Sequence, residues 1–325
     1  MAKSTFVKSI ALILLAAIVC ATCLVSLTAC KKKPGQNVDV TGDTGTTVDQ
    51  RTTNGETYTL DANRELFLLA AVDEAKYTDA EGHELEGGRA VAIFIASVDK
   101  TAGSEKIDMI QLDQNTMADM KTFNRYGLTE GTTRAQLALA YAYGDGGSES
   151  GQNLLNAVKS VTGLPLTSYV VIKSSAMPAL SRLSGDLTLT LTANHTDYDP
   201  TFTSGSTVTL PTSEFENFLR EQSAGFEANR RRMARMRDFV PAFFQALAAK
   251  KDQTQDQFNT LKDQLQYNFS DAELVSKLQT CAAYPMTSAV TPNGTSQLVG
   301  LTIEFEIDAA SLNQILINTC FKKGN

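Results

Sequence analysis

LFLLAAV, at residues 66–72, is a short continuous apolar run, and it predicts a buried strand. Two similar runs follow, AVAIFIASV at residues 90–98 and IDMIQL at residues 107–112. The polar stretch between them, residues 99–105, contains Gly103, so we expect these two runs to form a hairpin. Together the three runs predict the centre of one sheet.

Helical patterns are mixed with strands further along the chain. RAQLALAYAY, at residues 134–143, predicts a helix that ends at Gly144, and Ser150 is placed to cap a second helix that ends at Gly163. The next predicted elements are a strand over residues 169–172, a helix over residues 178–183 and an alternating strand over residues 186–192. This mixture predicts an α/β (α+β) domain over residues 59–249, with a single central mixed sheet flanked by helices.

The predicted long helix at residues 214–240 carries many arginines for an acidic protein. They are Arg220, Arg230, Arg231, Arg232, Arg235 and Arg237. One interpretation is a solvated face with local Glu–Arg pairs, which stabilise a helix by only about 0.2–0.5 kcal/mol each. The other is a site for a multiply charged phosphate group, because the guanidinium fork binds phosphate oxygens bidentately. Pro241 is expected to end or kink the helix.

Residues 250–325 predict a C-terminal extension that packs on the same domain. A polar amphipathic helix is expected over residues 251–268, and Ser270 is expected to cap the next helix. After a turn at residues 292–294, one amphipathic strand is expected within residues 296–307, followed by a closing helix over residues 309–320. The extension is therefore a helix-strand-helix segment added to the main sheet.

The amino-terminal residues have the pattern of an export signal. Residues 1–29 contain two lysines and then an uncharged apolar run, which ends at Leu-Thr-Ala before Cys30. We expect Cys30 to be lipidated, so that the lipid anchors the protein to the outer face of the cytoplasmic membrane; an uncleaved membrane helix is the alternative. Residues 30–58 have almost no large apolar side chains and predict a disordered tether.

The charge and composition exclude some classes of protein. The 325-residue chain has a net charge of −7, and removal of residues 1–29 with their two lysines makes it −9. This acidic balance argues against nucleic-acid binding. The sequence has two His and five Cys, which argues against a zinc site built from His and Cys ligands. His83 and His195 lie in polar sequence and are expected to be exposed. Cys281 and Cys320 can form a disulfide or remain as two buried thiols.

Six motifs, in order over residues 64–249, resemble those of the LytR-CpsA-Psr (LCP) family of exported envelope proteins. They are LLAAVD at 68–73, RAVA at 89–92, LDQNT at 112–116, LAYAYG at 139–144, GLPLTSYVVI at 163–172, and FLREQ at 218–222 with NRRRMARM at 229–236. The resemblance implies a divergent member of this family. It also implies the LCP fold and a role in Gram-positive cell-envelope assembly.

Members of that family transfer an anionic glycopolymer from its polyprenyl pyrophosphate lipid to peptidoglycan. Asp73 and Arg89 match catalytic positions of the family, and Asp73 also matches a ligand of Mg²⁺ or Mn²⁺. Arg220, Arg232 and Arg235 match arginines that bind the polyprenyl phosphate. The resemblance thus implies phosphoryl transfer, in which positioning and charge stabilisation contribute most of the catalysis.

The chain departs from the family pattern at several of these positions. The second metal carboxylate is replaced by Val91, and the Arg-Asp pair at the hairpin end is replaced by Gln114 and Asn115. Gln222, Asn229 and Met236 also differ from the family residues. With one carboxylate left, the sequence predicts a weak metal site. The alternative to a transferase is a catalytically degenerate binder of polyprenyl phosphate or anionic glycan, and an unrelated solute-binding lipoprotein is a third hypothesis.

Overall fold

The computed structural model describes residues 49–78, 84–85, 87–123, 129–220, 225–250 and 254–324. Residues 43–325 form one compact unit. The predicted export signal, Cys30 and most of the predicted tether lie outside the described residues. In the part of the chain that is described, none of the helices has the length and apolar character needed to cross a membrane.

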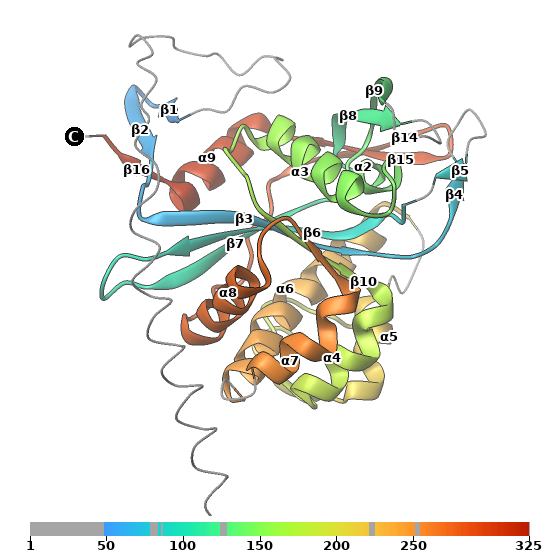
Figure 1. The fold of residues 1–325 in the computed structure, drawn as a ribbon, viewed down its shortest axis with the longest axis vertical. Helices are drawn as coiled ribbons and strands as arrows, with labels where there is room; N and C mark the ends of the chain where they lie inside the picture. The colour runs from blue at the N-terminus through green and yellow to red at the C-terminus, as the bar shows by residue number, and fades with distance from the viewer. Residues whose placement is uncertain are drawn as a thin grey trace, which may run out of the picture. The chain divides into compact units, whose positions relative to one another are not determined.

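The core of the fold is a five-stranded mixed sheet (Figure 1). Its strands, in spatial order, are β13 (Leu265–Tyr267), β10 (Tyr169–Lys173), β3 (Arg64–Val72), β6 (Ala90–Asp99) and β7 (Lys106–Leu112). β10 and β3 are parallel, whereas the other pairs are antiparallel. The predicted mixed sheet is confirmed, as is the hairpin formed by residues 90–112.

Helices cover both faces of this sheet (Figure 1). One face carries α2 (Leu139–Ala142), α3 (Ser148–Thr162) and α9 (Ala309–Cys320). The other carries α4 (Met177–Ser184), α5 (Phe215–Leu219), α6 (Phe226–Ala248), α7 (Thr254–Leu261) and α8 (Asp271–Ala283). In β3, Leu68 packs into the first layer and its neighbour Phe67 into the second. Burial on both faces explains why residues 66–72 are continuously apolar rather than alternating.

The predicted tether is too long at its carboxyl end. β1 (Gln50–Thr53) and β2 (Glu56–Leu60) form a hairpin, and β2 also pairs with β16 (Phe321–Lys323) at the other end of the chain. Arg51 is buried and donates hydrogen bonds to the carbonyl of Thr162 and to Asn313. The strands are polar, so only pairing with a distant strand stabilises them, and the local sequence carries no signal for it.

The predicted helix at residues 134–143 is mostly wrong. Residues Thr129–Gln136 form strand β9, which pairs with β8 (Met117–Phe123), and only the short helix α2 remains. The next helix begins at Ser148, and Ser150 lies inside its first turn, where its hydroxyl accepts a hydrogen bond from the amide of Gly146. Pairing between strands has overridden the local helical pattern. Gly163 does end α3, in the left-handed conformation with φ of 64°.

The predicted long helix at residues 214–240 is two helices. α5 ends at Leu219, Arg220 is extended, and α6 begins after Gly225, whose φ is 103°. α6 then continues through Pro241 to Ala248. Phe239 and Phe243 flank the proline and are buried in one cluster with β11 (Leu187–Thr190) and β12 (Thr207–Leu210), so tertiary packing stabilises the helix across the proline.

The C-terminal extension contains more strands than predicted. Residues 251–268 contain α7, a 3₁₀ turn and the edge strand β13. Residues 294–307 form a hairpin of β14 (Gly294–Val299) and β15 (Thr302–Ile307), with its turn at Gly300, where φ is 62°. Ser270 caps α8 through a capping box with Glu273, and α9 closes the fold as predicted.

Cys281 on α8 and Cys320 on α9 are free buried thiols, which settles the alternative that the sequence left open. Burial raises the pKa of each thiol to about 12. Since the thiolate is the reactive form, we expect neither residue to be alkylated in the native protein at pH 8, and both to react in denaturant. Peptide mapping after iodoacetamide treatment measures this. Native labelling of Cys281 or Cys320 would contradict their burial.

Candidate functional site

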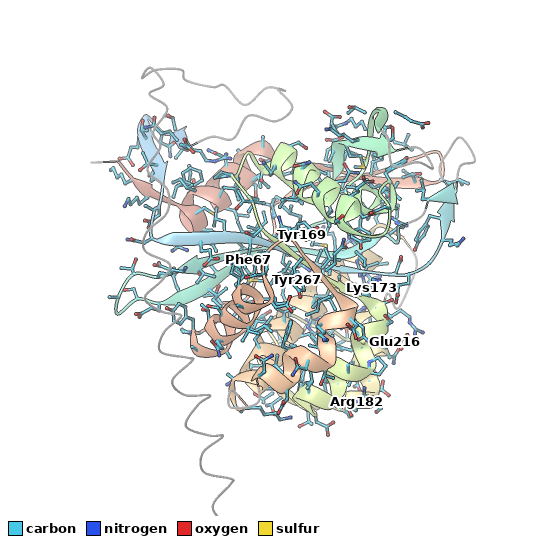
Figure 2. All side chains as sticks on the ribbon, viewed as in Figure 1. Phe67, Tyr169, Lys173, Arg182, Glu216 and Tyr267 are labelled. Carbon is cyan, nitrogen blue, oxygen red and sulfur yellow. The ribbon has the colours of Figure 1, made fainter. Side chains whose placement is uncertain are left out.

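A cavity of about 560 Å³ lies between the central sheet and helices α4, α5 and α6. Its lining is mainly apolar and includes four phenylalanines: Phe94, Phe239, Phe243 and Phe244. Its polar part is formed by six charged residues: Asp73, Arg89, Lys173, Glu216, Arg220 and Arg232. The sequence predicted five site residues within the folded domain, and four of them line this cavity; the fifth, Arg235, does not. In the view of Figure 2, Lys173 and Glu216 lie toward the same edge of the molecule.

Asp73 directly follows β3 and is fixed by the start of β6. Its Oδ1 accepts a hydrogen bond from the Arg89 amide at 2.8 Å, and its Oδ2 accepts one from the Tyr77 hydroxyl. Burial, followed by the hydrogen bond to Asp73, raises the pKa of Tyr77 to about 12. Tyr77 therefore remains a protonated donor at neutral pH, and both oxygens of the Asp73 carboxylate have partners.

Arg89 is the second predicted residue at this end of the sheet. Its guanidinium lies 5.3 Å from the centroid of the Tyr77 ring, and it donates a hydrogen bond of 2.9 Å to Gln136. Gln136 in turn donates to Asn115 and to the carbonyl of Ile303. The buried Nε of Arg89 has no hydrogen-bond partner among the described residues. The Arg89 guanidinium is thus held by Gln136, and its Nε–H donor makes no hydrogen bond to a described residue.

Arg232 reaches the cavity from α6 and is buried. It donates a hydrogen bond of 2.7 Å to Asn229, and Asn229 donates one of 2.6 Å to Asp113. Burial raises the pKa of Asp113, although the charge of Arg232 acts in the opposite direction. Asp113 was missed by the sequence reasoning. The signal was present, because Asp113 adjoins the altered pair Gln114 and Asn115 at the end of the hairpin.

Arg220 lines the cavity, whereas Arg235 does not. Arg220 follows α5, lines the cavity and forms an exposed ion pair of 2.8 Å with Glu216. Arg235 does not line the cavity: it is fully buried and forms an ion pair of 2.6 Å with Asp197. It also donates hydrogen bonds of 2.6 Å to the carbonyls of Phe218 and Arg220. These contacts fix the end of α5, and the phosphate contact of Arg235 stays a prediction.

The remaining arginines of α6 also have partners outside the cavity. Arg230 is exposed, with Glu227 at 3.5 Å, and Arg231 is 3.5 Å from Asp197. Arg237 donates to Gln111 and Thr291. Within α6, Arg232 therefore lines the cavity while these arginines have partners elsewhere, because successive helical residues point in different directions.

His195 is buried, contrary to the expectation from its polar neighbourhood. Its Nε2 lies 2.7 Å from Oδ2 of Asp238 on α6. Asp238 also accepts hydrogen bonds from the amide and the hydroxyl of Thr192. These contacts join α6 to the segment after β11, and neither His195 nor Asp238 lines the cavity. His83 lies outside the described residues.

Lys173 is a further cation that sequence reasoning missed. It is the last residue of β10 and lies opposite Val72 of the parallel strand β3, one residue before Asp73. The chain then enters the 3₁₀ turn Ser174–Ala176, where Glu74 accepts a hydrogen bond of 2.9 Å from the Ser175 amide. The hydrogen bonds from Ser175, assisted by the charge of Lys173, lower the pKa of Glu74. The signal was a charged residue at the carboxyl end of a buried parallel strand, where ligand sites form.

The donor set does not fit a resident Mg²⁺ or Mn²⁺ ion. Asp73 has both oxygens in hydrogen bonds, and Glu216 is exposed and paired with Arg220. Val91 lies in the register shift between β3 and β6 and lines the cavity with an apolar side chain. Over the described ranges, no three His, Cys, Asp or Glu side chains come together in a group that could hold a metal. Of the two carboxylates that line the cavity, Glu216 is paired with Arg220, which leaves Asp73 as the one carboxylate for a divalent ion and makes the site poor in oxygen ligands.

The other substituted positions also lie around this cavity. Gln114 and Met236 line it, whereas Asn115 and Asn229 join the hydrogen-bond networks behind Arg89 and Arg232. Gln222 lies outside the described residues. The networks behind Arg89 and Arg232 are therefore connected through Asn115 and Asn229.

Comparison with solved structures identifies the fold. Protein gbs0355 from Streptococcus agalactiae is similar with a TM-score of 0.58 and 13% identity, over 79% of this chain and 88% of its own. TagV of Bacillus subtilis has a TM-score of 0.56 and 14% identity, over 78% and 97%. TagT, solved bound to LI-WTA, has a TM-score of 0.55 and 14% identity, over 80% and 91%.

No curated protein matches the sequence of this chain. The model of the LytR_cpsA_psr family, by contrast, matches residues 33–318, which is most of the sequence. This match confirms the resemblance derived from the six motifs, and it covers both the main domain and the C-terminal extension. The chain therefore belongs to the LytR_cpsA_psr family.

Proposed function

We propose that the cavity binds a polyprenyl phosphate or pyrophosphate, with the isoprenoid chain inside and the phosphate at the charged end. The observation that carries this proposal is that three arginines, Arg89, Arg220 and Arg232, line the same cavity as four phenylalanines. Burial of an apolar chain contributes about 25 cal/mol per Å² of surface removed from water. Arginine forks add charge-assisted hydrogen bonds to the phosphate oxygens.

The biological role that fits this ligand is cell-envelope assembly outside the cytoplasmic membrane. In this role the chain transfers an anionic glycopolymer from its lipid carrier to peptidoglycan. Family membership supports the role, and so does the similar fold of TagT, which was solved bound to LI-WTA. A lipid on Cys30 would keep the cavity near the membrane that holds the carrier, and the sequence pattern of residues 1–30 supports this anchor.

The arginines have a defined task in such a transfer. They hold the phosphoryl oxygens in place and spread their negative charge, which is the main catalytic contribution in phosphoryl transfer. Asp73 orients the start of β6 through the Arg89 amide and so positions Arg89. Arg235 fixes the carbonyl of Arg220 and so positions the end of α5.

A binder without transfer activity is the second candidate, and one observation favours it. Asp73 is already satisfied by Tyr77 and Arg89, and Val91 supplies no second carboxylate. Incubation with a lipid-linked glycopolymer and peptidoglycan separates the two candidates. Polymer linked to peptidoglycan supports the transferase, whereas bound lipid without linkage supports the binder.

Lipid extraction tests the ligand directly. We expect the full chain, purified in mild detergent from a bacterial host, to release polyprenyl phosphate into organic solvent in an amount close to one per protein. Mass spectrometry measures the lipid, and the Arg230→Ala variant, altered on the exposed face of α6, is the matched control that should retain it. Protein that contains no such lipid and does not take up added polyprenyl phosphate would refute the proposal.

A further inference from the structure

We propose that Lys173 takes the electrostatic place of a divalent cation in this cavity, so that the protein binds a lipid phosphate without metal. The inference rests on the proposed function and deepens it, because it concerns how the same site neutralises the phosphate. It follows from the contacts of the six charged residues that line the cavity.

The three arginines of the cavity each have a protein partner. Arg89 donates to Gln136, Arg232 donates to Asn229, and Arg220 is paired with Glu216. Lys173 differs from them, since within the described ranges its ammonium group makes no direct hydrogen bond or ion pair and interacts with Glu74 through charge alone. An ammonium group has three rotatable donors and is a compact point charge, which suits a phosphate oxygen that arrives with the ligand.

The position of Lys173 is fixed by the fold. β10 and β3 are parallel and in register, with Lys173 opposite Val72, so Lys173 and Asp73 leave the sheet at the same edge. Glu74 holds the backbone that follows Lys173, through hydrogen bonds from the Ser175 amide and the Ser174 hydroxyl. The Lys173 side chain is half-buried and lines the cavity.

The neighbouring groups favour a cation here over a bound metal ion. Val91 offers no oxygen ligand, and Asp73 has both oxygens in hydrogen bonds. A metal ion here would share the Asp73 carboxylate with the hydrogen bonds from Tyr77 and the Arg89 amide, and Glu216 is paired with Arg220. The ammonium of Lys173 supplies positive charge without any such ligand set, and the cavity then presents four cations against two carboxylates.

The test is equilibrium binding of labelled geranylgeranyl phosphate to the full chain, in buffer with EDTA and in buffer with Mg²⁺. Geranylgeraniol, which has the same chain without phosphate, and inorganic phosphate are the comparison ligands. We expect equal affinity for geranylgeranyl phosphate in both buffers. Lys173→Met should weaken binding of geranylgeranyl phosphate on the order of tenfold and leave binding of geranylgeraniol unchanged. Lys173→Arg should restore most of the loss.

Lys262→Met is the matched control, because Lys262 is exposed and outside the cavity, and it should bind as the wild type does. Affinity that falls in EDTA and returns with Mg²⁺ would overturn the inference, as would wild-type affinity in Lys173→Met. Either result leaves lipid binding itself intact. If the wild type binds neither geranylgeranyl phosphate nor geranylgeraniol, the proposed function is overturned. If inorganic phosphate binds as tightly as geranylgeranyl phosphate, the site holds phosphate without using the lipid chain, which also overturns the proposed function.

Discussion

Arg232→Ala is expected to weaken the binding of polyprenyl phosphate about a hundredfold. The Arg232 guanidinium is buried at the cavity and oriented by Asn229, so it can give two charge-assisted hydrogen bonds to one phosphate. Each such bond contributes about 1.5 kcal/mol, and a loss of about 3 kcal/mol corresponds to about two orders of magnitude in affinity. Binding of labelled geranylgeranyl phosphate to the purified variant measures the loss.

Two comparisons make this prediction specific. Arg232→Lys keeps the charge but loses the fork, so we expect an affinity between those of the wild type and Arg232→Ala. Arg230→Ala removes an exposed arginine two residues away on the same helix and should leave the affinity unchanged. Equal affinities for Arg230→Ala and Arg232→Ala would show that the ligand is not held by the arginine that faces the cavity.

Arg235→Ala is expected to reduce the free energy of unfolding by about 3 kcal/mol or more. The substitution leaves Asp197 with only the more distant Arg231, and it removes the donors to the carbonyls of Phe218 and Arg220. Breaking a buried ion pair by removing one partner typically costs about 3–5 kcal/mol. Urea denaturation followed by far-UV circular dichroism measures the change, a suitable probe because the sequence contains no Trp.

The control is again Arg230, whose ion pair with Glu227 is exposed. Surface ion pairs contribute about 0–1 kcal/mol, so Arg230→Ala should unfold at nearly the urea concentration of the wild type. If Arg235→Ala were as stable as Arg230→Ala, the contacts of Arg235 would not hold α5 against α6. A stable Arg235→Ala with weakened lipid binding would return Arg235 to the phosphate-binding role first predicted for it.

The buried elements of this protein were predictable from local sequence. Residues 66–72, 90–98 and 107–112 are apolar because helices cover both faces of their sheet, and this burial is visible in composition alone. The capping box at Ser270 and the helix end at Gly163 are also local, since each depends on residues within one turn. The order of the motifs was enough to identify the family.

Elements that depend on a distant partner were not predictable. β2 and β16 stabilise each other from opposite ends of the sequence, and β9 requires β8 where the local pattern favoured a helix. α6 continues through Pro241 because phenylalanines on both sides pack into one cluster. In each case the stabilising contact is made with a different segment of the chain, and the pattern of the segment itself carries no information about it.

The same division applies to the site. The sequence predicted that Asp73, Arg89, Arg220 and Arg232 contribute to one site, and in the structure these four residues line one cavity. Only the tertiary structure decided that Arg235 is bound by Asp197, that His195 is buried against Asp238, and that Lys173 joins the cavity. The physical reason is direction: sequence gives the spacing of charges along a helix or strand, whereas the packing of elements decides which of them face the same cavity.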